Sequence, residues 1–153
     1  MGNNWKITDT LTKVFAEEAP DGQGSIRLST LHRETVSCVI AYFGAADWGR
    51  YWKVSVKAPE KIETRLRRVE LVPSAYPCHK EQDDNYLRIV PGMYPDLLRD
   101  LDTEDDGADK KYLTKEVPGQ WRSLWLDVTV DAELAGGDYA IMIETETENG
   151  EKE

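Results

Sequence analysis

The feature that most constrains the fold of this chain is the alternation of apolar and polar side chains at a spacing of two residues. The clearest example, Thr35–Phe43, places apolar side chains at Val36, Cys38, Ile40 and Tyr42. Successive side chains of an extended strand point to opposite faces, so this segment presents one apolar face to a core. The pattern predicts a β-strand, because the apolar positions of a helix recur every three to four residues.

The same alternation recurs along the chain. The further segments that we predict as strands are Ser25–Leu31, Trp52–Ala58, Ser123–Val130 and Tyr139–Glu144. Several short strands separated by turn residues are typical of two packed antiparallel sheets. The sequence therefore predicts an all-β fold, an immunoglobulin-like or fibronectin-like antiparallel β-sandwich.

The segment Ile62–Val72 changes phase part-way along its length. Ile62 and Leu66 follow one phase of the alternation, whereas Val69 and Leu71 follow the other. One extra residue in a strand, a β-bulge, produces such a slip. A register break at a turn is the alternative interpretation.

A long connection runs from Ser74 to about Lys111. Within it, Tyr94–Leu101 has the composition of a short helical turn, with Pro95 near the first helical position. Loops of this length in a compact domain usually serve a function or pack against something. We expect one long loop that carries one short helical turn.

The 153 residues fit a single domain, 1–153. We expect an N-terminal extension over 1–22, the sandwich over 23–147, and an acidic tail or the start of a linker over 148–153. No apolar stretch approaches the roughly 20 residues that span a bilayer, and the N-terminus lacks the basic and apolar regions of a signal peptide. We therefore expect a cytoplasmic chain with no membrane partner, in which Cys38 and Cys78 are reduced thiols.

The net charge of −10 is unevenly distributed. Residues 1–80 hold 12 Lys and Arg against 9 Asp and Glu, whereas residues 81–153 hold 7 against 20. Nucleic-acid binding needs a basic face that displaces counterions from phosphates. The one basic cluster, Arg65–Arg68, would lie on both faces of a strand, so we expect salt bridges to the acidic half and no nucleic-acid partner.

The sequence contains no motif of a known catalytic, metal or cofactor site. The acidic segment Asp102–Gly107 resembles the start of a calcium loop, but Leu113 stands where such a loop needs a bidentate Glu. His32 and His79 belong to no metal-ligand spacing. We therefore predict no catalytic residue, no metal site and no cofactor.

Aromatic residues are the positive feature, with five Trp and seven Tyr. Exposed rings stack on the apolar faces of sugars, whereas buried rings fill a core or a contact with a neighbouring domain. The candidate residues for a contact with carbohydrate or with another domain are Trp48, Tyr51, Tyr94, Trp121 and Trp125.

Several segments resemble one protein family in their order along the chain. They are Leu11–Pro20, the Arg33-Glu34 pair before Thr35–Phe43, Val69–Ser74, Pro91–Leu98, Gly119–Val130 and Ala135–Tyr139. Together they resemble the N-terminal β-sandwich of bacterial glycoside-hydrolase-like proteins that carry the domain of unknown function 4091. Those proteins are similar to glycoside hydrolase family 123, the β-N-acetylgalactosaminidase type.

The resemblance implies that catalysis resides in a C-terminal (β/α)8 barrel, which lies outside this sequence and would be the partner of the sandwich. It therefore assigns no catalytic residue to this chain. One hypothesis is a non-catalytic accessory domain that packs against the barrel and shapes its cleft. The alternative is an independent carbohydrate-binding module with two or three coplanar exposed rings.

Overall fold

Strands and loops make up the whole of the chain that the structure describes. The computed structural model describes residues 5–44, 51–76, 78, 80–81, 85–105 and 110–147, and none of these residues is helical. The strands in these ranges are β1 (Trp5–Thr8), β2 (Thr35–Phe43), β3 (Tyr51–Lys57), β4 (Ile62–Ser74), β5 (Gly92–Asp100), β6 (Thr103–Asp105), β7 (Lys110–Lys115), β8 (Trp121–Val130) and β9 (Met142–Thr147). Every pairing between them is antiparallel. The predicted all-β class is confirmed.

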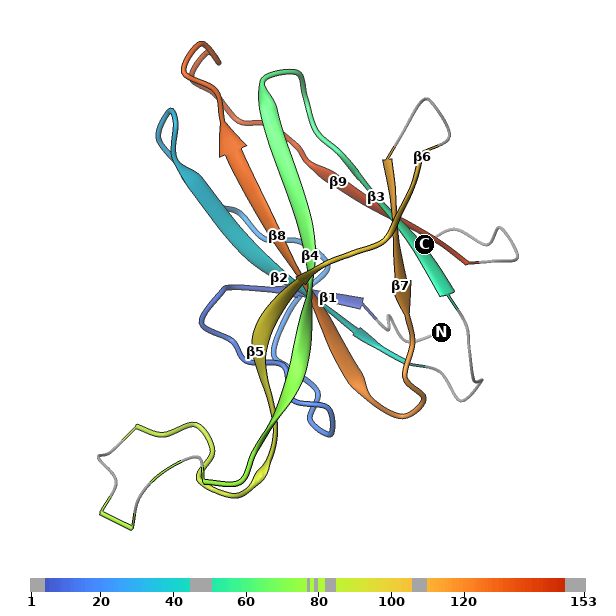
Figure 1. Ribbon diagram of the computed structural model, residues 1–153. Coiled ribbons are helices and arrows are strands. Elements are labelled where there is room, and N and C mark those ends of the chain that lie inside the picture. The colour runs from blue at the N-terminus through green and yellow to red at the C-terminus, as the bar shows by residue number, and fades with distance from the viewer. Residues whose placement is uncertain are drawn as a thin grey trace.

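The strands form two sheets, which Figure 1 shows as a sandwich-like arrangement. The larger sheet has the order β1-β2-β8-β4-β5, and the smaller one has the order β6-β7-β3-β9. β8 pairs with the full length of β2 on one side and with residues 62–69 of β4 on the other. Its position between two partners agrees with its sequence, which is apolar at every second position from Leu124 to Val130 and carries Trp on the other face.

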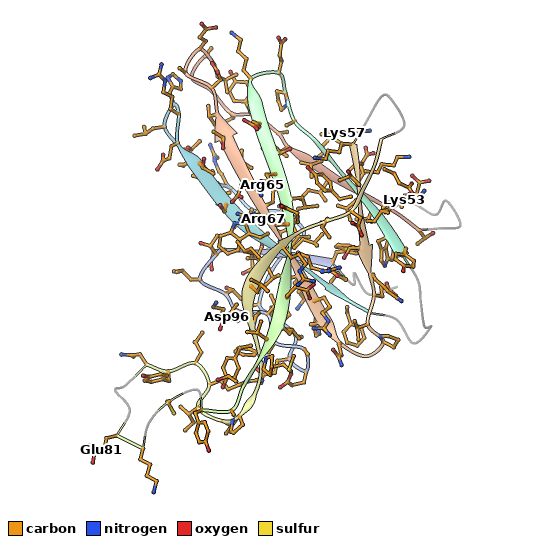
Figure 2. All side chains as sticks on the ribbon, in the orientation of Figure 1. Lys53, Lys57, Arg65, Arg67, Glu81 and Asp96 are labelled. Atoms are coloured by element: carbon orange, nitrogen blue, oxygen red, sulfur yellow. The ribbon has the colours of Figure 1, made fainter. Side chains whose placement is uncertain are left out.

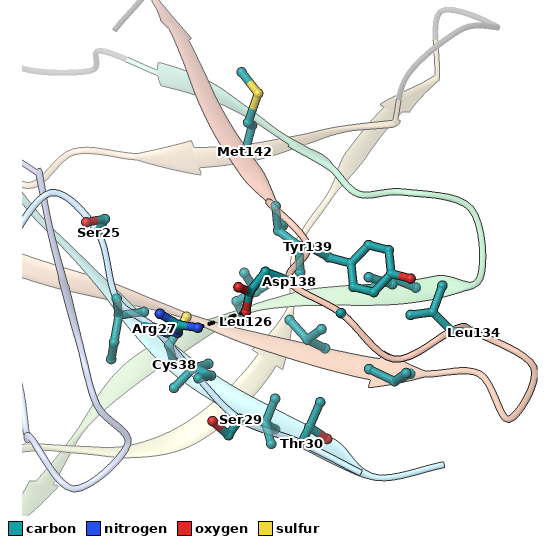
Figure 3. Close-up of a pocket in the computed structure, with 18 of the residues that line it drawn as sticks. Ser25, Arg27, Ser29, Thr30, Cys38, Leu126, Leu134, Asp138, Tyr139 and Met142 are labelled. Atoms are coloured by element: carbon teal, nitrogen blue, oxygen red, sulfur yellow. Dashed lines mark hydrogen bonds and ion pairs between the residues drawn. The ribbon is translucent and has the colours of Figure 1, made fainter. Parts of the chain in front are cut away.

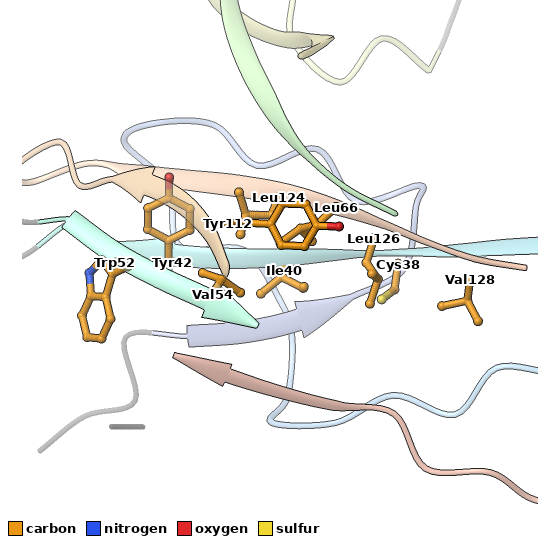
Figure 4. Packing of buried hydrophobic residues seen from close by; sticks show 10 residues of the cluster. All are labelled: Cys38, Ile40, Tyr42, Trp52, Val54, Leu66, Tyr112, Leu124, Leu126 and Val128. Atoms are coloured by element: carbon orange, nitrogen blue, oxygen red, sulfur yellow. The ribbon is translucent and has the colours of Figure 1, made fainter. Parts of the chain in front are cut away.

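Side chains from both sheets meet in one apolar core (Figure 4). Leu124, Ile40 and Val54 are at most 2% exposed, and they come from β8, β2 and β3. The buried members of this core are Cys38, Ile40, Tyr42, Trp52, Val54, Leu66, Tyr112, Leu124, Leu126 and Val128. All ten lie on strands, and within each strand they are separated by two or four residues. The alternation in the sequence therefore identified the core-facing sides of β2, β3 and β8 correctly.

A second, smaller core lies on the outer face of the larger sheet. The segment 9–20, which follows β1, packs there, and it buries Val14 to 2% exposure. Val14 contacts Val39 and Ala41, with Trp121 and Trp125 partly buried around them. Part of the expected N-terminal extension, residues 1–22, thus contributes the edge strand β1 and a cover for the sheet.

This second core explains the change of phase in the segment Ile62–Val72. β4 runs unbroken from Ile62 to Ser74, so the interpretation as a break at a turn is wrong. Leu66 faces the main core, whereas Val69 faces the outside of the sheet, where it lines a small cavity with Val14. An irregularity is present between Glu70 and Leu71 in the pairing with β5, where the extra residue belongs to β5. β4 therefore needs apolar side chains on both faces.

Three predicted elements differ from the structure. Tyr94–Leu101 is no helical turn, because β5 covers Gly92–Asp100 and its main chain pairs with β4. The predicted strand Ser25–Leu31 is irregular: the one isolated bridge to β1 from this part of the described chain joins Ile7 to Gln23, which precedes the segment. The last predicted strand begins at Met142 instead of Tyr139, because its partner β3 ends at Lys57, before a proline.

A tight turn holds the entry to β8 against the end of β2. Pro118 and Gly119 occupy the central positions of this turn, the Gln120 N–H bonds to the Val117 carbonyl at 3.1 Å, and Gly119 has a φ of 70°. Such a turn favours glycine at its third position. The adjacent Gly44 also requires glycine, because a Cβ there would lie 2.2 Å from the Val117 carbonyl oxygen.

The second core predicts unequal effects of truncation at two neighbouring positions. Val14→Ala removes two buried methyl groups and should lower the free energy of unfolding by about 2 kcal/mol. Leu11→Ala, at a side chain that is 85% exposed, should change it by less than about 0.5 kcal/mol. Urea denaturation followed by tryptophan fluorescence measures both. Equal effects would contradict the proposed role of segment 9–20.

Candidate functional site

The strands β4 and β5 extend beyond the rest of the larger sheet. β4 pairs with β8 only as far as Val69, whereas its pairing with β5 continues to Ser74 and Gly92. The described residues between 70 and 97 thus form a two-stranded ribbon with a long connection at its tip, which we call the arm. The arm projects from the sandwich in Figure 1, and Figure 2 shows Asp96 near its base and Glu81 near its tip.

The arm exposes many large apolar side chains. Tyr76 is 92% exposed and Leu87 is 74% exposed. The full set on the arm is Tyr76, Tyr86, Leu87, Ile89, Val90, Met93 and Leu97. Large exposed apolar patches usually mark sites of interaction with other proteins, membranes or ligands.

Arg88 attaches the connection of the arm to the segment 9–20. Its guanidinium carbon lies 3.8 Å from the centre of the Phe15 ring, and its nitrogens lie 2.6 Å from carboxylate oxygens of Glu17 and Glu18. The hydrogen bond from Arg88 holds the pKa of Glu17 below its usual value. The arginine side chain is 13% exposed, so the contact combines stacking on an aromatic ring with two ion pairs.

Two further contacts hold the base of the arm. The rings of Tyr94 and Phe15 pack edge to face with centres 5.9 Å apart, and the Tyr94 hydroxyl donates to the Val90 carbonyl at 2.5 Å. Lys13 Nζ lies 2.9 Å from a carboxylate oxygen of Asp96. A surface held in one arrangement before binding loses less conformational entropy on association.

The structure separates the aromatic residues singled out from the sequence. Trp121 and Trp125 lie on the outer face of β8, where Trp121 packs against Phe43 at 5.4 Å between ring centres. Tyr51 lies in the other sheet and is 40% exposed, whereas Tyr94 lies in the arm. Trp48 falls outside the described residues. Thus Trp121 and Trp125 share one face, and Tyr51 and Tyr94 lie elsewhere.

Trp125 belongs to a polar network that holds one carboxylate. Its indole N–H donates to Asp127 at 2.7 Å, the Ser37 hydroxyl donates to the same oxygen at 2.7 Å, and Arg67 lies 2.5 Å from the other oxygen. Burial alone would raise the pKa of Asp127, but these hydrogen bonds and the charge of Arg67 outweigh it, and the pKa is lowered. Asp127 is therefore an anion that joins β2, β4 and β8.

A large cavity lies at the open side of the sandwich, between residues 24–32 and 134–143. Its volume is about 800 Å³, and buried side chains such as Leu126 and Val128 form its floor. Figure 3 shows the ion pair between Arg27 and Asp138 at this opening, with a separation of 2.8 Å. Asp138 is the only carboxylate among the described residues that line the cavity. Hydrolysis of a glycoside normally uses two.

Cys38 also lines this cavity. It is 4% exposed, and burial raises the pKa of its thiol to about 11. Since the thiolate is the reactive form, Cys38 is inert near neutral pH. Cys78 lies in the arm, where its thiol is 3.6 Å from the Ile89 carbonyl oxygen.

The described residues contain no group of three His, Cys, Asp or Glu side chains that could hold a metal ion. The acidic segment Asp102–Gly107 lies partly outside the described ranges, as does His79. Within the described ranges, no helix has the length and apolar character that crossing a membrane requires.

Sequence patterns did not reveal the contacts that fix the arm. Arg88 and Phe15 are 73 positions apart, and neither belongs to a segment that we predicted from periodicity. The resemblance did include Leu11–Pro20 and Pro91–Leu98, which the structure brings together at the base of the arm.

Comparison with models of known protein families gives no match, and no curated protein matches the chain.

The two cysteines should differ in reactivity. At pH 8 a thiol with a pKa of about 11 is ionised in roughly one molecule in a thousand. Iodoacetamide should therefore modify Cys78 in the folded chain and leave Cys38 unmodified until urea unfolds it. Mass spectrometry of the peptides measures both reactions. Equal labelling of the two thiols under native conditions would contradict the buried position of Cys38.

The Asp127 network predicts a pH-dependent contribution to stability. The folded-state pKa lies below the unfolded value, so the carboxylate stabilises the fold above the unfolded pKa and loses this effect as the pH falls through the folded one. At pH 7, Asp127→Asn should cost on the order of 2 kcal/mol. Urea unfolding at pH 7 and pH 2.5 should show a smaller difference from wild type at the lower pH. A difference independent of pH would show that the charge of Asp127 has no such effect.

Proposed function

We propose that this chain is a non-catalytic N-terminal accessory domain of a bacterial glycoside-hydrolase-like protein. In this proposal it packs through its arm against a C-terminal catalytic barrel of the same polypeptide and shapes the cleft of that barrel. The immunoglobulin-like type of its sandwich and its relation to proteins with the domain of unknown function 4091 are parts of the same proposal.

The exposed apolar side chains of the arm are the observation that carries the proposal. Leu87, Val90 and Tyr76 are each more than half exposed, although the arm is held firmly at its base. By contrast, the outer face of the smaller sheet carries charged pairs such as Lys53–Glu104 and Lys57–Glu144. The arm is therefore a fixed apolar surface that contact with another domain would cover.

The positions of the segments that carry the family resemblance also favour the arm as the contact surface. Val69–Ser74 and Pro91–Leu98 form the two strands at the base of the arm, and Leu11–Pro20 supplies Phe15, Glu17 and Glu18 beneath it. Three of the resembling segments thus build one structural unit. A contact with a common partner domain accounts for their association.

The alternative function is an independent carbohydrate-binding module. It needs two or three coplanar exposed rings beside polar groups, and the described candidates are distributed over two sheets and the arm. Titration of the isolated chain with N-acetylhexosamine oligosaccharides, followed by tryptophan fluorescence, tests it. Saturable binding would favour the module, whereas the accessory-domain proposal predicts no change in fluorescence.

The decisive experiment compares this chain with the full-length protein encoded by its gene. The coding sequence is expected to continue in frame into a (β/α)8 barrel with paired acidic residues. Amide hydrogen exchange at residues 85–98 should then be at least ten-fold slower in the full-length protein, because the barrel covers the arm. Equal exchange in both forms would overturn the proposal.

A pair of variants separates arm contact from a general loss of solubility or folding. Leu87→Asp in the full-length protein should restore fast exchange across the arm, since a buried unpaired carboxylate opposes docking. Leu31→Asp is the matched control, because Leu31 is 76% exposed but lies outside the arm. It should leave exchange in the arm unchanged.

A further inference from the structure

Charged side chains occupy one face of the larger sheet at the root of the arm. Arg68 and Glu70 of β4 lie on the face that carries Leu66, and Arg122 of β8 lies on the face that carries Leu124. Across β5, Arg99 is the partner of Arg68 and Leu97 is the partner of Glu70. We call Arg68, Glu70, Leu97, Arg99 and Arg122 the arm-root face.

The smaller sheet covers this face incompletely. Leu124 is fully buried and Leu66 is 2% exposed. Two residues further along β4, the side chain of Arg68 is 31% exposed, and Leu97 on β5 is 45% exposed. The same face of the sheet therefore passes from the main core to a surface that opens toward the arm.

The charges on the arm-root face do not balance. Arg68 forms an ion pair with Glu70 at 2.5 Å. Arg122 donates a hydrogen bond to the Gln120 side chain at 2.7 Å and has no carboxylate within ion-pair distance among the described residues, and Arg99 has none either. This face thus holds three guanidinium groups and one carboxylate, which is paired with Arg68, on a chain whose net charge is −10.

Arg122 is the partly buried charged group on this face that forms no ion pair with any described residue. Desolvation lowers the pKa of its guanidinium; Tyr42 and Glu70 act in the opposite direction without offsetting the desolvation, and repulsion from Arg68 adds to the lowering. A guanidinium offers five N–H donors, of which the structure engages one. A partly buried charge without a counterion is unfavourable, and a carboxylate that binds two of the free N–H groups would remove that cost.

We propose that the arm-root face receives an acidic side chain of the domain that docks on the arm, with Arg122 as its ligand. The inference rests on the proposed function, since the exposed Leu97 makes this face continuous with the apolar surface of the arm. Arginine surrounded by apolar contacts is a frequent centre of binding energy in protein interfaces. An acidic sugar is the less suitable occupant, because the aromatic ring nearest to Arg122 on β2, Tyr42, is 1% exposed and unable to stack on a ligand.

Arg122→Gln tests the proposal in the full-length protein. Loss of one member of a buried charge pair should raise the population of the undocked arm roughly thirty-fold or more, measured by hydrogen exchange at residues 85–98. Arg27→Gln is the matched control, because Arg27 is 83% exposed and lies at the cavity opening on another part of the molecule. It should change the exchange of the arm by less than two-fold.

The Tm of the isolated chain is a second measurement, and it distinguishes a binding role of Arg122 from a role in the stability of the fold. Because Arg122 is desolvated there without a counterion, Arg122→Gln should leave the Tm of the isolated chain unchanged or raise it. A lower Tm would show that Arg122 serves the fold itself and would overturn the inference. Saturable binding of glucuronate to the isolated chain, abolished by Arg122→Gln, would assign the site to an acidic sugar and overturn it as well.

The two proposals fail in different ways. If Leu87→Asp releases the arm and Arg122→Gln has no effect on exchange, the arm docks without this ion pair and only the inference is wrong. If exchange in the arm is the same in the isolated chain and in the full-length protein, the proposed function is wrong.

Discussion

Burial of apolar side chains on both faces of the larger sheet is the constraint on which the rest of the structure depends. On one face, Leu124 and Ile40 meet the smaller sheet. On the other, Val39 and Ala41 meet Val14. A sheet with two apolar faces needs two covers, and the segment 9–20 supplies the second. Because that segment also binds the base of the arm, the arrangement of the arm follows from the same burial.

This constraint also explains which parts of the fold the sequence could predict. Alternation identified β2, β3 and β8, since each has one face in the main core and partners on both edges. It misassigned Ser25–Leu31, because alternation describes the faces of a strand and contains no information about a partner at its edge. It missed β7, where Tyr112 and Thr114 are the buried positions among lysines.

The candidate surface was predictable only in part, for a related reason. A search for aromatic residues found Tyr94. The predicted connection from Ser74 to about Lys111 includes part of the arm, but β5, β6 and the start of β7 also lie within it. The search did not find Phe15 or Arg88, whose contact is a tertiary one between distant positions. Local sequence patterns report the neighbours of a residue along its own strand. The groups that hold the arm were therefore visible only once the second core had been located.

The positions of the charged residues in the two sheets explain part of the uneven charge distribution of the sequence. In the sequence, the acidic residues are concentrated after position 80. In the smaller sheet, Glu104 is the cross-strand partner of Lys111, and Glu146 is that of Lys53. The carboxylates also form ion pairs across the intervening strand, Glu104 with Lys53 and Glu146 with Lys111, so these contacts neutralise part of the excess. At the arm root, residues of like charge are paired instead, because Arg68 and Arg99 are cross-strand partners. Like charges in that position oppose strand pairing. They lie beside an exposed apolar arm and beside Arg122, which forms no ion pair within the described residues. In our proposal, the compensating carboxylate comes from another domain.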